Sequence, residues 1–193
     1  MTARIMDAEA TWECLRAAPV HESADVATFP RVTKQVSVSR EIAAPADTVW
    51  AMVSDVTRMG EWSPENVGGT WLDGAAGPQP GARFRGTNQH GKRKWTSVAT
   101  VVDSEPGRRF SFRVTAGGGI KVAEWGYSFE PTATGCRVTE TWKDERPRFF
   151  KPISRMGTGV SDRATYNRAG MEQTLERLAA VAESTSAPRS RDE

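Results

Sequence analysis

The segment Val160–Glu183, VSDRATYNRAGMEQTLERLAAVAE, decides the fold of this chain. Its apolar residues recur at intervals of three and four, which is the spacing of one face of an α-helix. The residues concerned are Met171, Leu175, Leu178 and Ala182. Ser161 or Asp162 can cap the start of the helix by accepting backbone N–H groups. The segment therefore predicts one amphipathic helix of about five or six turns.

The chain in front of this helix shows mainly the alternation of β-strands. A first strand is expected over 33–42, followed by two short helices over 44–53 and 56–62. Six more strands are expected, separated by turns rich in glycine. Their ranges are 67–72, 82–89, 92–105, 108–116, 120–131 and 135–144. Consecutive strands joined by short turns form an antiparallel sheet, so we predict an α+β domain in which seven strands pack against the last helix.

Length and composition suit one domain with a sizeable core. The chain has 193 residues, 38% of them hydrophobic, and its 26 basic and 24 acidic residues are mixed along its length. No concentrated basic face is expected, so a nucleic-acid partner is not predicted. No stretch predicts a membrane span or a signal peptide, and we expect a cytoplasmic protein. The domain is expected over 33–184, with a flexible extension over 1–32 and a disordered tail over 185–193.

Many aromatic residues fall on the inward phase of the predicted strands. Tryptophan and tyrosine carry a polar group that seeks a partner when buried, so several of them on one concave face favour the lining of a pocket. Ordinary core packing is the alternative. The predicted ligand-binding residues are five from the sheet and two from the last helix: Trp95, Phe112, Trp125, Tyr127, Trp142, Asn167 and Met171. Asn167 could instead hold a loop backbone.

Two charged residues, Arg40 and Glu140, also fall on inward positions of strands expected to be neighbours. A buried charge is costly alone, so a structural ion pair between them is one interpretation. The other is that they form the polar end of a ligand pocket. Asn88 and Tyr127 share the inward phase. These four residues, Arg40, Glu140, Tyr127 and Asn88, are the candidates for a catalytic role.

The sequence does not indicate histidine catalysis, a metal site or a phosphate-binding loop. His90 stands beside Gly91 in a predicted turn, where we expect it to be exposed and without an acid partner. The sequence contains no cysteine–histidine cluster of metal-binding spacing and no phosphate-binding glycine loop. We therefore predict no metal and no cofactor.

The stretch 144–159 interleaves basic residues with aromatic ones. Such a stretch can contact a membrane surface or an acidic ligand. The alternative is a lid in which Phe149, Phe150 and Ile153 close over a pocket mouth while Arg146, Lys151 and their neighbours stay in water.

Several local sequences resemble one known superfamily. VSREIAAPADTVW at 38–50, PGARF at 80–84, EPGRRF at 105–110 and TETW at 139–142 are similar to the polyketide cyclase/dehydrase-like members of the START-related, birch-pollen-allergen-like (SRPBCC) superfamily. The resemblance covers about residues 33–184. It implies a helix-grip fold, in which a curved seven-stranded antiparallel sheet wraps around the long C-terminal helix, with two short helices after the first strand.

The resemblance also implies an internal cavity for a hydrophobic small molecule of polyketide, lipid or isoprenoid type. Three functions remain open on sequence grounds. The protein could be an aromatase/cyclase or dehydratase working without metal or nucleotide, a non-catalytic lipid carrier, or a protein-interaction module of the same fold. A monomer or a homodimer is expected.

Overall fold

The computed structural model describes residues 34–186. The predicted extension over 1–32 and almost all of the predicted tail lie outside these residues. The elements follow the order β1 Gln35–Ile42, α1 Ala46–Ser54, η1 Val56–Glu61, β2 Asn66–Trp71, β3 Arg83–His90, β4 Arg93–Glu105, β5 Arg109–Ala116, η2 Gly117–Gly119, β6 Ile120–Thr132, β7 Gly135–Asp144, α2 Phe150–Thr158 and α3 Arg163–Ser186. The predicted seven strands and two short helices are confirmed.

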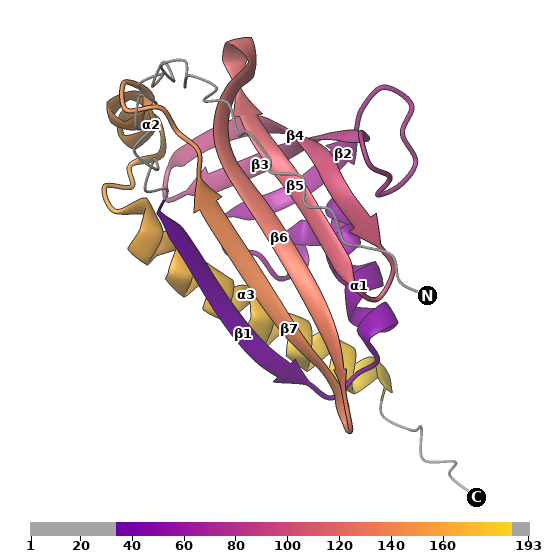
Figure 1. Cartoon of the computed structure of the whole chain (residues 1–193). Helices are drawn as coiled ribbons and strands as arrows, with labels where there is room; N and C mark the ends of the chain where they lie inside the picture. The colour runs from indigo at the N-terminus through magenta and orange to yellow at the C-terminus, as the bar shows by residue number, and fades with distance from the viewer. Residues whose placement is uncertain (1–33, 187–193) are drawn as a thin grey trace, which may run out of the picture. The chain divides into compact units, whose positions relative to one another are not determined.

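The seven strands form a single antiparallel sheet in the order β1-β7-β6-β5-β4-β3-β2. The strand order follows the chain except that β1 lies beside β7, as the helix-grip fold requires. Helix α3 runs along β1 and β7 (Figure 1). The predicted fold class is therefore confirmed: one long helix held against a curved antiparallel sheet.

Three irregularities interrupt the ladder of the sheet. The extra residues are Val67 in β2, Val102 in β4 and Val122 in β6. An extra residue in one strand bends that strand and increases its twist. The sheet can therefore curve around α3 instead of lying flat against it.

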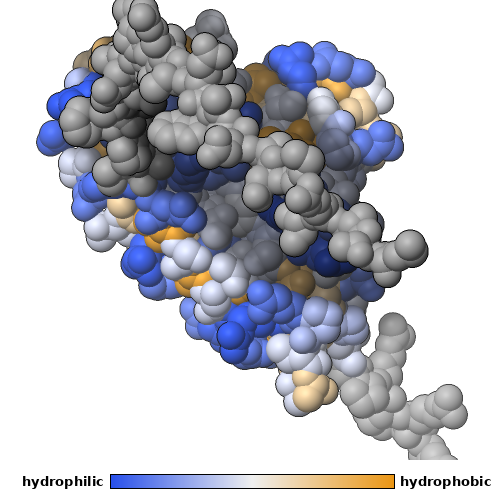
Figure 2. Space-filling view, in the orientation of Figure 1, coloured by the Kyte–Doolittle hydropathy of each residue, from blue (hydrophilic) through white to orange (hydrophobic). Residues whose placement is uncertain are grey.

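Strand alternation sorts the residues between two faces. Buried residues of β7 are every second one, including Cys136, Val138, Glu140 and Trp142. The outward positions between them are polar, for example Arg137 and Thr139. The coloured surface in Figure 2 is largely hydrophilic, with single hydrophobic residues scattered on it. The apolar side chains of the sheet are therefore gathered on its inner face.

The C-terminal half of α3 packs into the main core. Leu175, Leu178, Ala179 and Ala182 are buried against a cluster that includes Phe110 and Val138. The helix starts three residues later than predicted, because the side chain of Asp162 accepts N–H bonds from Ala164 and Thr165 and so caps the helix. None of the helices in residues 34–186 is long and apolar enough to span a membrane.

Helix α2 was not predicted as a helix. Pro152 falls in its first turn, where a missing N–H removes no helical hydrogen bond. The helix ends at Gly159, whose φ of 77° is left-handed and whose N–H donates to the Arg155 carbonyl over 2.8 Å. The sequence pattern failed here because the nine residues contain two basic residues and a proline but few buried ones.

Candidate functional site: a cavity between the sheet and the N-terminal half of α3

A cavity of about 370 Å³ lies inside the domain. Its walls come from the inner face of the sheet, from the N-terminal half of α3 and from α2. The sheet contributes the first residue of β2, inward residues along β3, the later residues of β5 and β7 and the earlier residues of β4 and β6. In an antiparallel sheet the last residues of one strand lie beside the first residues of the next, so most of these positions lie at the same end of the sheet. The cavity therefore occupies one end of the sheet, and the core formed with the C-terminal half of α3 occupies the other.

Aromatic side chains make up much of the cavity wall. Trp125 and Trp142 lie directly opposite each other on β6 and β7, with ring centroids 6.5 Å apart. Phe112 lies opposite Trp125 on the next strand, and its ring is 5.2 Å from that of Phe84. Aromatic pairs at these separations attract one another, so the wall is held together by its own side chains.

All seven residues predicted to bind ligand line this cavity. They are Trp95, Phe112, Trp125, Tyr127, Trp142, Asn167 and Met171. Their side chains come from four strands and one helix. Asn167 is buried, and its amide makes no hydrogen bond to another residue of the range 34–186, so the predicted bond to a loop backbone is not formed. Contact of these residues with a ligand stays a prediction.

The deepest polar group of the cavity is the pair Tyr127–Glu140. The two residues lie opposite each other on β6 and β7, and the Tyr127 hydroxyl donates to Glu140 Oε1 over 2.7 Å. Tyr127 also belongs to the main core cluster, so the pair lies where the cavity meets the core. Burial raises the pKa of Glu140 to about 8, although the Tyr127 hydrogen bond acts in the opposite direction. Glu140 is therefore a neutral carboxylic acid near neutral pH.

The predicted ion pair between Arg40 and Glu140 is wrong. The register places Val38 opposite Glu140 and Arg40 opposite Val138. Arg40 is exposed and is not part of the cavity wall. Since β1 is an edge strand, a long cationic side chain on its inner phase can bend past the edge into water. Arg40 is accordingly dropped from the candidate site.

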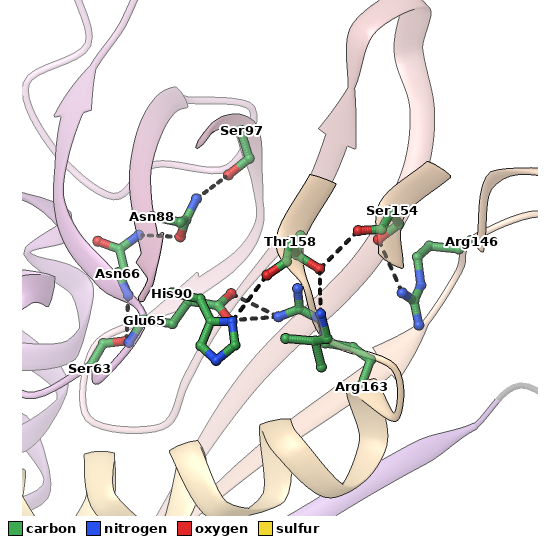
Figure 3. Close-up of polar contacts among 11 residues, drawn as sticks. Ser63, Glu65, Asn66, Asn88, His90, Ser97, Arg146, Ser154, Thr158 and Arg163 are labelled. Carbon is green, nitrogen blue, oxygen red and sulfur yellow. Dashed lines mark hydrogen bonds and ion pairs between the residues drawn. The ribbon is translucent and has the colours of Figure 1, made fainter. Parts of the chain in front are cut away.

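Asn88 belongs to a row of polar side chains along one wall. Its amide nitrogen donates to Ser97 Oγ over 3.2 Å, and its amide oxygen accepts from Asn66 over 3.4 Å (Figure 3). The Ser63 hydroxyl accepts the backbone N–H of Asn66 over 3.0 Å. Gly86 lies beside this row, where a Cβ atom would stand 3.0 Å from the Asn66 amide nitrogen. The row supplies hydrogen-bonding groups to an otherwise apolar wall.

An ion pair that the sequence did not reveal stands at the start of α3. Arg163 donates to both carboxylate oxygens of Glu65, over 2.9 and 2.6 Å (Figure 3). Its guanidinium also lies over the rings of Trp95 and Tyr166. All four residues line the cavity. Glu65 and Arg163 are 98 positions apart in the chain, so no local spacing could have paired them.

His90 is not the free turn residue that the sequence indicated. It ends β3, and its Nδ1–H donates to the Thr158 carbonyl at the end of α2 over 3.1 Å. Its ring packs edge-on against Tyr166, with centroids 5.0 Å apart. His90 therefore ties the end of α2 to β3 and α3.

The segment before and within α2 covers the cavity, as the lid interpretation expected for Phe150 and Ile153. Two details differ from that interpretation. Phe149 is 66% exposed and does not line the cavity. Arg146 is not solvated: its guanidinium bonds both oxygens of the buried Asp144, over 2.8 and 3.0 Å, and also Ser154.

The ionic state of Asp144 follows from these contacts. Burial alone would raise the pKa of Asp144, but the hydrogen bonds and charge of Arg146, together with the charge of Lys151 at 3.3 Å, outweigh burial and lower it. Asp144 is therefore ionised and paired, whereas Glu140, four residues earlier on the same strand face, is not paired with any cation of residues 34–186. Within that range, no three residues of types His, Cys, Asp and Glu stand close enough to hold a metal ion.

The fold and the cavity together define a class of protein: a helix-grip domain with an internal cavity whose wall holds several aromatic rings. Residues 33–183 match the family described as polyketide cyclase / dehydrase and lipid transport, and the chain belongs to that family. No curated protein sequence matches the chain significantly.

Solved structures agree with this assignment. The Polyketide_cyc-like protein Cgl2372 from Corynebacterium glutamicum is 32% identical, with a TM-score of 0.56, over 83% of this chain and 98% of its own. The di-domain ARO/CYC StfQ from the steffimycin biosynthetic pathway has a TM-score of 0.62 at 17% identity, over 80% of this chain and 52% of its own. Protein CV1439 from Chromobacterium violaceum has a TM-score of 0.59 at 15% identity, over 77% of this chain and 97% of its own. The latter two show a shared fold.

Proposed function

We propose that the protein binds a hydrophobic small molecule of polyketide, lipid or isoprenoid type in the cavity between the sheet and α3. The observation that carries this proposal is the cavity itself, about 370 Å³ with several aromatic rings in its wall. That volume lies within the range of sites for small organic molecules. Burial of an apolar ligand there would be driven by removal of its surface from water.

The polar groups of the cavity favour a site that orients its ligand over a simple carrier. A carrier of bulk lipid needs an almost wholly apolar wall, whereas this wall holds Glu140, Tyr127, Asn88 and Asn167. Orientation of a reactive chain by a few fixed polar groups is the means by which a cyclase or dehydratase could act without metal or nucleotide. Cyclase or dehydratase activity is therefore the first candidate reaction, and StfQ, named as an ARO/CYC, has the same fold.

A protein-interaction role receives less support. A protein-interaction module needs no internal cavity, and this domain has one. A cytoplasmic location and a monomeric or homodimeric state stay predictions.

The test is identification of the ligand and loss of it in a cavity variant. Protein purified from its own host is examined by native mass spectrometry, and any co-purifying molecule is extracted and identified. Trp125→Ala is expected to reduce the ligand load several-fold while far-ultraviolet circular dichroism shows a retained fold. Trp50→Ala is the matched control, because Trp50 is also partly buried but lies in α1, away from the cavity wall. An unchanged load in Trp125→Ala would remove the cavity from consideration as the site.

A further inference from the structure

Glu140 is the one carboxyl group in residues 34–186 that borders the cavity without a cationic partner. Glu65, the other carboxylate of the wall, is paired with Arg163. Glu140 Oε1 accepts from Tyr127, but Oε2 is buried and has no hydrogen-bond partner in the described part of the chain. A buried polar oxygen without a partner costs free energy, so native proteins rarely keep one unless something else uses it.

The surroundings of Glu140 leave its second oxygen free to serve a ligand. On the sheet, its neighbours of the inner phase are Tyr127, Val38 and Trp142. Glu140 is a cavity-wall residue, so a ligand in the cavity can approach Oε2 while Oε1 stays hydrogen-bonded to Tyr127.

The charged and titratable groups around the cavity do not alter this state. Arg163 and Glu65 neutralise each other at the start of α3, and Arg146 is taken by Asp144 beside α2. Burial is the main reason that Tyr166, also on α3, has a raised pKa. Burial is also the main reason that the pKa of Tyr127 on β6 is well above its ordinary value. Both tyrosines are therefore neutral wherever Glu140 is neutral, and no cation among residues 34–186 is placed to ionise Glu140.

We propose that Glu140 acts as a neutral carboxylic acid that donates a hydrogen bond from Oε2 to a carbonyl oxygen of the ligand. This inference rests on the proposed function and adds a chemical requirement to it: the ligand is uncharged at that end and carries a ketone, ester or similar acceptor. Tyr127 is a positioning residue, because its hydroxyl occupies Oε1 and so leaves Oε2 as the oxygen that carries the proton. An acceptor oxygen fits this proton, whereas a ligand carboxylate would bury a charge in the cavity where Arg163 and Arg146 are already paired.

The sign of the expected pH dependence follows from the protonation state. Only the acid form has a proton to donate, and burial raises the pKa of Glu140 to about 8. Affinity for a ketone should therefore be constant below that pKa and fall as pH rises through it. Well above it, the fall is about tenfold for each pH unit if the ionised form does not bind.

Two neutral aromatic dyes provide the test. Prodan is a naphthyl ketone whose emission shifts to the red when its carbonyl accepts a hydrogen bond, and N-phenylnaphthylamine is a control dye without a carbonyl. Binding of each is titrated by fluorescence at about pH 6.5 and about pH 9. Wild-type protein is expected to bind prodan at least fivefold more weakly at the higher pH and to bind N-phenylnaphthylamine equally at both.

Two substitutions distinguish the role of the hydrogen-bond donor at position 140 from the role of its ionisation. Glu140→Gln keeps an N–H donor and cannot ionise, so it should bind prodan within about threefold of wild type at the lower pH and should lose the pH dependence. Glu140→Met keeps a side chain of similar size but has no hydrogen-bond donor. This variant should bind prodan several-fold more weakly, and the bound prodan should emit further to the blue.

Each contrary result has a distinct meaning. Equal pH responses of the two dyes, or tighter prodan binding at the higher pH, would overturn the inference but leave the cavity as a ligand site. Binding of neither dye would count against the proposed function itself. If the variants fail to fold, the wild-type comparison of the two dyes decides the matter alone.

Discussion

The two halves of α3 face the same sheet with different results. The C-terminal half, from Leu175 to Ala182, presents small and branched apolar residues that fill the space against Phe110 and Val138. The N-terminal half, from Asn167 to Met171, faces a wall of large rings, and a cavity remains between them. The large rings pack against one another across neighbouring strands. They therefore do not fill the space next to the turn of α3 that contains Gly170, which has no side chain. The difference teaches that one helix and one sheet can build a stable core at one end and a binding space at the other.

The largest effect is expected from a matched pair on α3. Leu178→Ala should lower the free energy of unfolding by about 3–5 kcal/mol, because it opens a void in a closed core. Met171→Ala should cost about half as much, because its side chain borders an existing cavity and has fewer neighbours to lose. Urea denaturation of both variants measures this. An equal or greater loss for Met171→Ala would mean that the cavity end is packed as tightly as the core.

The next effect concerns the pH dependence of stability. The pKa of Glu140 is about 8 in the folded protein against an ordinary value of 4.5, so the folded state holds its proton more tightly than the unfolded state. Its stabilising contribution is complete below about pH 4.5 and is lost as pH rises towards about 8.

Glu140→Gln removes that loss. The variant should gain stability relative to wild type by about 1 kcal/mol per pH unit across this window, on the order of 2–4 kcal/mol in all. Thermal or urea unfolding from about pH 5 to about pH 8.5 checks the trend. A stability difference that is flat with pH would show that Glu140 is already ionised in the folded protein.

A smaller effect on stability is expected from alanine substitutions in two turns, one at the core end of the sheet and one at the cavity end. Gly107, in the β4–β5 turn, and Gly91, in the β3–β4 turn, have φ values of 66° and 57°. A Cβ at Gly107 would also collide with the Asp47 carboxylate of α1, whereas one at Gly91 meets nothing. Gly107→Ala should therefore cost about 2–3 kcal/mol and Gly91→Ala about 1 kcal/mol. Calorimetric melting temperatures test the order, and the reverse order would contradict the tighter contacts assigned to the core end.

The smallest effect is expected where His90 holds α2. His90→Phe keeps a ring against Tyr166 but removes the hydrogen bond to the Thr158 carbonyl. A neutral hydrogen bond contributes about 1 kcal/mol, so amide hydrogen exchange in α2 should become roughly three- to tenfold faster with little change in global stability. Exchange in α1 is the internal control. Unchanged exchange in α2 would show that His90 does not hold the lid.

Strand alternation explains why so much of the site could be predicted. Period two assigns each side chain to a face, and the turn glycines set the lengths of the strands. With the face known, Trp125, Trp142 and Asn88 follow as inward residues whatever the curvature of the sheet. The same logic fails at Arg40, because alternation gives the phase of a side chain but not whether anything covers it at an edge strand.

Helix α2 and the contacts at the start of α3 escaped prediction for other reasons. The helix is short and only one of its nine residues is buried, so its sequence gives little sign of a packed element. The pairs Glu65–Arg163 and His90–Thr158 join residues 98 and 68 positions apart, and only the closure of the fold brings them together.

The sequence by itself determined the order of the strands, the two short helices and the last helix, together with the inner face of the sheet and its aromatic character, because these depend on local periodicity and turn chemistry. The tertiary structure alone decided that the aromatic face encloses a cavity at one end, that Glu140 pairs with Tyr127 instead of Arg40, and that α2 covers the opening. These features depend on strand register and on the curvature that the bulges introduce. Register and curvature bring together residues far apart in the chain, and no local pattern encodes them.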